Sequence, residues 1–507
     1  MEFWKKVFSI AEDAGLVDHG MDLWRDAARQ MFKALPTNMS DQGAMLPLNT
    51  AQHRRLTVEE ANRPCTAYNP QTLLETLNEF TGKTHTMESQ KRLRDTLGAA
   101  CDGSRNCDFG TIYSWYRLEA TGLLRGTDLW ESLWDPMAAL KSHSDVGHSR
   151  VNIKTGCHGN KVIHHHKFAD PLRLWDLYSH RVIPFRWFKM SELSVISVTQ
   201  IFHYANYWAI SHSWVADDEL VAVTTQVNQE QHPVPLPRDV SLDDIRDELL
   251  QLGGQFCWLD ILCHRQKCID YNGQPFPGWE DRTVNNHKWP ELEEMRKEEW
   301  KAYMPMMGQI YQKAKKTVRW FNGIGREFST TGWKDDRHWC NRVWTLQETC
   351  DWDDNFLTGG YPGGDLDLNV KCEYGGEWLT ARALLKSTLK RTPFMLQLAA
   401  LDLRRDAYCW ETFRKYFVAI NERVCSNNVD RVNGLNFLLC LDPIPVYQEN
   451  DTVEKAWTRS WSILHEGLSK AIQVELKLSE PTWQDLLNHL KITPGKPSPR
   501  VMGVDKP

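Results

Sequence analysis

Three short apolar runs, separated by helical patterns, restrict the fold of this chain more than any other feature. The runs cover residues 207–211, 256–262 and 317–321. Ser241 can cap a helix between the first two runs, and Gly253 can end it. Apolar residues at helical spacing over 307–314 precede the third run. Strands that alternate with helices predict parallel strands joined by crossover helices, the pattern of an α/β domain.

A further helix is expected after the third run. Its apolar stripe consists of Trp339, Val343, Leu346 and Cys350. At roughly 100° per residue, Glu348 lies on the opposite side of this helix from Leu346. Glu348 therefore need not be buried in the core, and its position allows it to face a cleft. The alternative is an ordinary surface ion pair, or a pair with Arg342.

The regions on either side of this domain have patterns of their own. Apolar residues at helical spacing over 7–14, 23–35 and 73–80 predict an N-terminal region of helices and loops. The same spacing over 413–420 predicts a helical C-terminal region. Residues 221–240 and 264–300 are polar and are expected to be insertions. The expected division is an N-terminal region of unknown function over 1–167, the α/β domain over 168–375, the helical region over 376–490 and a flexible tail over 491–507.

Charge and composition exclude several classes of partner. The net charge is -6 and no basic patch is interleaved with the 23 tryptophans, so core packing explains them better than base stacking, and no nucleic-acid partner is expected. The 13 cysteines form no tight framework, the N-terminus does not resemble a secretory signal, and no apolar run is long enough for a bilayer. We expect a cytoplasmic protein with reduced thiols and no membrane span.

Polar side chains lie at or near the ends of the first two apolar runs. Ser211 is the last residue of the first run, and Asp260 lies in the second half of the second run. Ligands of open parallel sheets bind beyond the carboxyl ends of strands, so these residues are candidates for a cleft. The alternative for both, and for Asp217, is the capping of turns and helices. Ser211 and His212 do not form a catalytic pair, because neighbours on a strand point to opposite faces.

Two other motifs carry less information. Gly323 and Gly325 follow the third run but lack the third glycine of a dinucleotide fingerprint, which indicates a simple turn. Cys101 and Cys107 are too widely spaced for a paired zinc motif, although a loop with Cys157 and the histidines of 158–166 leaves structural zinc open. No metal ligand is assigned.

The middle of the chain resembles the heterokaryon incompatibility (HET) domain of fungal proteins. The similar segments are Trp208-Ala-Ile-Ser-His-Ser-Trp214, Phe256-Cys-Trp-Leu-Asp-Ile-Leu-Cys-His-Arg-Gln266, Ile310-Tyr-Gln-Lys-Ala314 with Thr317-Val-Arg-Trp320, Trp339-Cys-Asn-Arg-Val-Trp-Thr-Leu-Gln-Glu348 and Asp430-Arg-Val-Asn-Gly434. The chain departs from the family pattern at His212, Val215 and His264, where Tyr, Gly and Ile are usual. The resemblance covers roughly residues 170–450.

The resemblance implies a fold and two functions. The family is regarded as remotely TIR-like, which implies a flavodoxin-like parallel sheet with flanking helices. It implies nonself recognition or regulated cell death, with protein partners or self-assembly. Some TIR domains cleave NAD with a Glu, so Glu348 is the candidate catalytic carboxylate, and Ser211, Asp260 and Trp344 are candidates for a nucleotide cleft. In this alternative NAD is the substrate, and no other cofactor is implied.

Overall fold

The computed structural model describes residues 53–88, 91–104, 107–121, 152–156, 160–164, 170–188, 205–270, 273–328, 335–349, 357–360, 371–374, 377–380, 409–439 and 441–495. The chain divides into two compact units, Met1–His53 with Met190–Tyr204, and Arg54–Lys189 with Ala205–Pro507. All features discussed below belong to the second unit. The helices expected at 7–14 and 23–35 lie outside the described residues.

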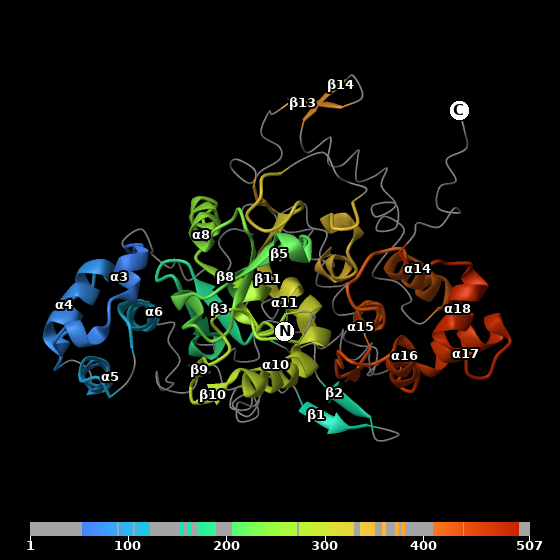
Figure 1. Ribbon diagram of the computed structural model, residues 1–507, viewed down its shortest axis with the longest axis horizontal. Helices are drawn as coiled ribbons and strands as arrows, with labels where there is room; N and C mark the ends of the chain where they lie inside the picture. The colour runs from blue at the N-terminus through green and yellow to red at the C-terminus, as the bar shows by residue number, and fades with distance from the viewer. Residues whose placement is uncertain are drawn as a thin grey trace, which may run out of the picture. The chain divides into compact units, whose positions relative to one another are not determined.

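A six-stranded mixed sheet forms the centre of the α/β region (Figure 1), with the strand order β12-β11-β5-β8-β3-β4. The strands are β3 (Arg173–Asp176), β4 (Arg181–Pro184), β5 (Ala205–His212), β8 (Phe256–Leu259), β11 (Ala314–Trp320) and β12 (Leu357–Thr358). The three predicted runs are adjacent and parallel, since Ile210 pairs with Val318 on one side and Leu259 on the other. The α/β class is thereby confirmed for the described residues.

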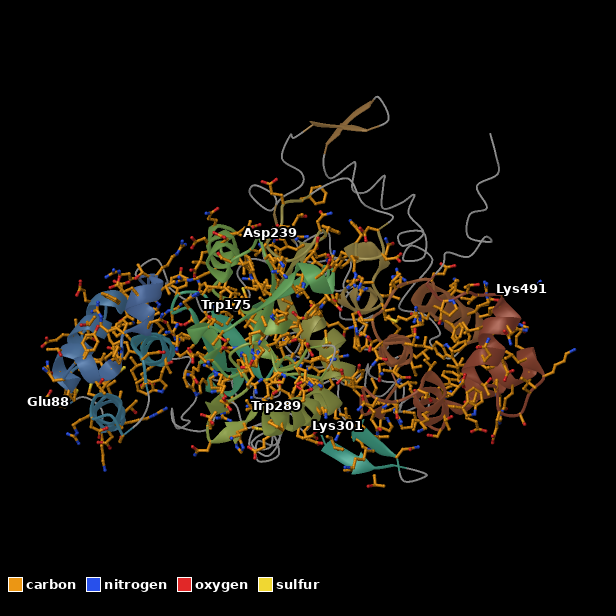
Figure 2. The ribbon with its side chains drawn as sticks, viewed as in Figure 1. Glu88, Trp175, Asp239, Trp289, Lys301 and Lys491 are labelled. Carbon is orange, nitrogen blue, oxygen red and sulfur yellow. The ribbon has the colours of Figure 1, made fainter. Side chains whose placement is uncertain are left out.

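The sheet is not wholly parallel, which corrects one expectation. Strand β3 runs antiparallel to β8, and β4 runs antiparallel to β3. Every residue of this hairpin is buried, including Trp175, which Figure 2 labels on β3, and Arg173. Its charged residues concealed the hairpin in the sequence. Arg173 donates two hydrogen bonds of 2.9 Å to buried Glu299, which offsets the cost of burying its charge.

The second strand is shorter than expected. Strand β8 stops at Leu259, and the short helix α9 (Asp260–Cys263) begins inside the predicted run. The Asp260 carboxylate accepts a 2.7 Å hydrogen bond from the amide of Ile261, which favours the turn into a helix. An apolar run alone does not distinguish these two conformations.

Helices lie between the parallel strands in the chain. They are α8 (Leu242–Gln251), α10 (Trp289–Tyr303), η10 (Met304–Met306) and α11 (Met307–Lys313). The side chain of Ser241 accepts a hydrogen bond from the amide of Asp244, which confirms the predicted cap of α8. The polar stretch 264–300 is not a plain insertion, because it contains α10. This helix buries Glu293, Arg296 and Glu299. Because these buried positions are charged, the segment lacks the apolar periodicity that predicts a helix.

The expected helix over 339–350 does not form. The chain instead makes two 3₁₀ segments, η11 (Trp339–Asn341) and η12 (Trp344–Thr349). Between them, the amide of Val343 donates to the carbonyl of Val424 (3.0 Å), and the amide of Val424 donates to the carbonyl of Asn341 (2.7 Å). This pairing with a distant segment uses backbone groups that a continuous α-helix needs for itself.

The N-terminal part of the described chain is helical, as predicted for 73–80. Its elements are α3 (Val58–Asn62), η3 (Cys65–Ala67), α4 (Pro70–Thr81), α5 (Lys91–Cys101) and α6 (Phe109–Ala120). Helix α6 joins the sheet hairpin through buried polar groups. Ser114 donates to Asp176 at 2.7 Å, and Arg181 lies 3.0 Å from Asp108 at the cap of α6.

The C-terminal part is also helical, with α14 (Trp410–Asn421), α15 (Val429–Leu438), α16 (Val453–Trp461), α17 (Glu466–Leu476) and α18 (Trp483–Leu490). These helices share one hydrophobic core with the segment that follows β11. Phe321, Trp339 and Leu346 belong to the same buried cluster as Phe417 and Trp483. Among the described helices, none has the length and hydrophobicity that a bilayer span requires.

The remaining elements are short. They are β1 (Asn152–Thr155), β2 (Lys161–His164) and β15 (Ile444–Pro445) in a three-stranded sheet, the hairpins β6 (Leu220–Val223) with β7 (Val234–Pro237), β9 (Thr283–Val284) with β10 (His287–Lys288) and β13 (Lys371–Tyr374) with β14 (Glu377–Thr380), and the 3₁₀ turns η6 (Phe185–Trp187), η8 (Asp217–Glu219) and η9 (Gln226–Asn228). The hairpin of β6 and β7 falls almost wholly in the stretch 221–240 that was expected to be a polar insertion, and it was not expected.

Candidate functional site

Side chains from the ends of two strands and from both 3₁₀ segments meet at one edge of the sheet. Ser211, near the end of β5, donates a hydrogen bond to the carboxyl group of Glu348. The indole of Trp339 donates to the same Ser211 hydroxyl at 2.6 Å. Ser211 therefore links η11 to η12, and all three side chains are buried. The predicted proximity of Ser211 and Glu348 is present in the structure.

His212 and Asp260 form a second pair beside the first. The imidazole Nε2 of His212 lies 2.8 Å from Asp260 Oδ1, and Nδ1 lies 3.2 Å from the carbonyl of Ser213. Both ring nitrogens thus face oxygen acceptors, an arrangement that the protonated ring satisfies with two donors. The side chain of Asp260 is 17% exposed, so the cluster approaches solvent at this residue.

The two carboxyl groups of this cluster have opposite electrostatic environments. Burial, with a smaller effect from the charge of Asp260, raises the pKa of Glu348 to about 7. Burial also disfavours the charged form of Asp260, but the adjacent His212 outweighs it and lowers the pKa of Asp260. The pKa of His212 is raised, because Asp260 outweighs the effect of burial. Glu348 is thus partly protonated near neutral pH, beside an ion pair of His212 and Asp260.

Tyr311 and Arg319 complete the surroundings of Glu348. The Tyr311 hydroxyl donates to the carbonyl of Ile210 at 3.0 Å, and its pKa is raised by burial and then by the charge of Glu348. Arg319 lies on β11 with its guanidinium 5.3 Å from the centroid of the Trp339 ring. One of its nitrogens lies 3.4 Å from the backbone carbonyl of Glu348. These contacts hold η12 against the sheet.

Glu348 is only 7% exposed, whereas the expected helix left it free to lie outside the core. The helical geometry used for that expectation does not apply to two 3₁₀ segments. The helical geometry also placed Trp339 and Glu348 on opposite faces, whereas in the structure both side chains hydrogen-bond to Ser211. Nor does Glu348 form an ion pair with Arg342. Trp339 is the member of the cluster that was not predicted, because it was assigned to the apolar stripe of the expected helix.

Trp344 lies near a different carboxyl group. Its side chain hydrogen-bonds to buried Asp430, which also accepts a 3.0 Å hydrogen bond from the hydroxyl of Tyr447. Burial raises the pKa of Asp430 to about 7 despite these hydrogen bonds. Segment η12 therefore contacts buried polar groups at both ends, since its Trp344 bonds to Asp430 on α15 and its Glu348 bonds to Ser211 on β5. The assignment of Trp344 to a nucleotide cleft remains a prediction.

The other motifs singled out in the sequence have simple structural roles. Gly323 and Gly325 lie in a turn with φ of 110° and 72°, where glycine is favoured. Asp217 is in the short turn η8 and lies 3.8 Å from Arg337. His264, where the family pattern has Ile, lies 3.2 Å from Glu299 and joins its buried ion pair.

Metal ligation has no support among the described residues, which contain no group of three or more His, Cys, Asp or Glu side chains suited to an ion. Cys107 and Cys65 lie together, with a 2.9 Å hydrogen bond between the Cys65 amide and the Cys107 carbonyl. The side-chain hydrogen bond with Cys65, and then burial, raise the pKa of Cys107. Cys157, His158, His165 and His166 lie outside the described residues.

The arrangement can move a proton at a defined position. A carboxyl group with a pKa near 7 can act as an acid or a base at neutral pH, and Ser211 holds one of its oxygens. A carboxyl group so placed can also hydrogen-bond the hydroxyls of a sugar. The His212–Asp260 pair interacts electrostatically with this acid, and the Asp260 side chain is partly exposed to solvent.

The chain was compared with models of protein families, with curated proteins and with solved structures, and none of the three comparisons finds a match.

Proposed function

We propose that this protein acts in nonself recognition or regulated cell death of the heterokaryon incompatibility type, through a TIR-like signalling domain. The strand order supports this proposal. Numbered along the chain, the parallel strands β5, β8, β11 and β12 have the order 2-1-3-4, which is that of flavodoxin-like sheets. Protein partners or self-assembly would transmit the signal, as the resemblance implies.

A second candidate function is the cleavage of NAD with Glu348 as the essential carboxylate. The observation in its favour is the contact between Glu348 and Ser211 at the carboxyl edge of parallel strands, where ligands of such sheets bind. The carboxyl group would stabilise positive charge that develops on the ribose as the nicotinamide leaves. Its pKa of about 7 allows the ionised form at physiological pH.

One experiment tests both candidates. The full chain is expressed from an inducible promoter in fungal cells, and viable cells, NAD and nicotinamide are measured over time. The signalling candidate predicts that viability falls while NAD stays constant, and that Glu348→Gln retains the effect because a neutral amide can replace the protonated acid. The hydrolase candidate predicts that NAD falls, nicotinamide rises and Glu348→Gln abolishes both.

Exposed Glu411 on α14 supplies the matched control, since Glu411→Gln makes the same chemical change far from the cluster in sequence. Unchanged viability and unchanged NAD during expression of the wild-type chain at full level would contradict both candidates.

A further inference from the structure

Two cysteines that are distant in the sequence face each other on paired segments of the N-terminal helical part. Cys65 begins η3 and is fully buried, and Cys107 precedes α6 and is 6% exposed. The amide of Cys65 donates to the carbonyl of Cys107 at 2.9 Å, and the amide of Phe109 donates to the carbonyl of Arg63 at 2.8 Å. These two hydrogen bonds are those of an antiparallel pair, and they fix the register of the two segments.

This register places the two thiols within reach of a covalent bond. Residues that face each other across antiparallel hydrogen bonds have Cα atoms roughly 5.5 Å apart, inside the range of about 4.4–6.8 Å that disulfides require. Their side chains point to the same side of the pair. Accordingly, the thiols of Cys65 and Cys107 share a side-chain hydrogen bond, and both are free cysteines in the structure.

A third cysteine lies near this pair. Cys101 is partly exposed and ends α5, so it does not belong to the two paired segments. The turn that follows it packs on η3, because a methyl group added at Gly103 would lie 3.5 Å from Cγ2 of Thr66. Cys101 is therefore the competitor against which a bond between Cys65 and Cys107 has to be tested.

We propose that Cys65 and Cys107 form a reversible disulfide when the protein meets hydrogen peroxide. Peroxide oxidises the thiol of Cys107, the more exposed of the two, to a sulfenic acid and leaves as one water molecule. The thiol of Cys65 then attacks this sulfur, the S–S bond forms, and a second water molecule is released. The two thiols lose two protons and two electrons, and the peroxide takes up all of them.

The environment of the pair makes this reaction slow. The side-chain hydrogen bond with Cys65, and then burial, raise the pKa of Cys107. Because the thiolate is the form that reacts with an oxidant, little of the reactive species is present at neutral pH. We therefore expect the pair to stay reduced during brief exposure and to oxidise under sustained exposure, faster at higher pH.

The bond would tie three helical elements together beside the sheet. Asp108 caps α6 and lies 3.0 Å from Arg181 on β4, which in turn donates to Asn62 at the end of α3 at 2.6 Å. A disulfide at this place links η3 to the start of α6 and closes a loop that contains α4 and α5. Because loop closure restricts the unfolded chain, oxidation should raise the thermal midpoint by about 5 °C.

Peptide mapping tests the bond directly. The purified full chain is freed of reductant and incubated with hydrogen peroxide at pH 7 and pH 8.5. Free thiols are then blocked with N-ethylmaleimide, and the protein is digested without reduction and analysed by mass spectrometry. We expect linked peptides that contain Cys65 and Cys107, two hydrogens lighter than the separate peptides, with a higher yield at pH 8.5. Dithiothreitol should separate the peptides and return the thermal midpoint to that of the reduced protein.

Substitutions assign the rise in midpoint to this bond. Cys65→Ala should abolish both the linked peptides and the rise. Cys107→Ala should do the same from the other segment, which covers the case that one variant does not fold. Cys425→Ala is the matched control, because the partly exposed thiol of Cys425 accepts a hydrogen bond from Arg431 at 2.8 Å near α15. It should retain both the linked peptides and the rise.

Three results would overturn the proposal. The first is a bond from Cys101 to either buried cysteine in place of the one between Cys65 and Cys107. The second is a Cys65 that remains unlinked after exposure that oxidises Cys101. The third is a rise in midpoint that Cys65→Ala and Cys107→Ala both retain.

Discussion

At the scale of single residues, Glu348 has an unusual position. Its carboxyl group is buried beside the carboxyl ends of the parallel strands and has few polar contacts. Its one side-chain hydrogen bond in the described structure comes from Ser211. An exposed carboxylate has its lowest free energy when ionised, but burial reverses this preference near neutral pH and raises the pKa to about 7. The native state therefore binds a proton that the unfolded chain releases.

This raised pKa has a consequence for stability. The contribution of Glu348 is fully present below the ordinary pKa of 4.5 and is lost as pH rises through about 7. We expect the unfolding free energy of the wild type to fall by roughly 3 kcal/mol more than that of Glu348→Gln across this window. Urea unfolding at several pH values between 4.5 and 8 measures the difference. Equal slopes for the two proteins would show that Glu348 titrates normally.

Only part of this cluster could be predicted from the sequence. Ser211 and Asp260 were found because parallel strands bring their carboxyl ends to one edge, a rule that needs only strand assignments. The expected helix put Trp339 and Glu348 on opposite faces. That helix does not form, because Asn341 and Val343 pair through their backbones with Val424, which is distant in the sequence and could not be identified from it. Because side chains alternate along a strand, a catalytic pair of Ser211 and His212 was excluded. This alternation does not exclude the bond that His212 makes with Asp260, which directly follows the neighbouring strand β8.

At the scale of elements, the contact between α11 and α15 depends on a glycine. A methyl group added at Gly308 would lie 2.2 Å from the ring of Phe437, far inside van der Waals contact. Phe437 is buried on α15, so its ring has little space to move. The close approach of these two helices is therefore possible only without a side chain at position 308.

Two glycine substitutions test this contact. Gly308→Ala should lower the unfolding free energy by about 1–3 kcal/mol, because overpacking exceeds the gain in helix propensity. Gly98→Ala on α5 is the matched control, since no atom lies within 4 Å of its added methyl, and it should gain about 0.5–1 kcal/mol. Denaturant unfolding measures both. Equal effects of the two substitutions would contradict the close contact.

Elements with regular patterns were predictable, and elements with buried charges were not. Strand β5 and helix α8 follow their apolar periodicity and their cap closely. Helix α10 and strand β3 escaped prediction because Glu299 and Arg173 occupy positions where apolar residues are expected. Such charges are stable in the protein interior only when each forms an ion pair with the other. A single sequence does not show which charged residues pair.

At the scale of the whole molecule, the C-terminal helices and the segment after β11 share a core. Phe417 on α14 is fully buried in the same cluster as Trp339, whose indole holds Ser211. A boundary near residue 376 was expected from the change to helical patterns. A shared core implies that the helices and the sheet edge unfold together, whatever their boundary in sequence.

Hydrogen exchange can test this coupling. Phe417→Ala should cost about 3–5 kcal/mol and reduce the protection of β5 and β11 amides along with those of α14. Val474→Ala on α17, where the side chain is 77% exposed, should leave protection unchanged. Loss of protection confined to α14–α18 would instead show that the helical region unfolds independently.

The antiparallel hairpin of β3 and β4 has a practical consequence for any shortened chain. A fragment that begins near residue 208 would lack these strands and leave one side of β8 without a neighbouring strand. Its amide and carbonyl groups would then be free to recruit another chain, which is how open sheet edges lead to aggregation. A soluble fragment of this protein should therefore start before Arg173.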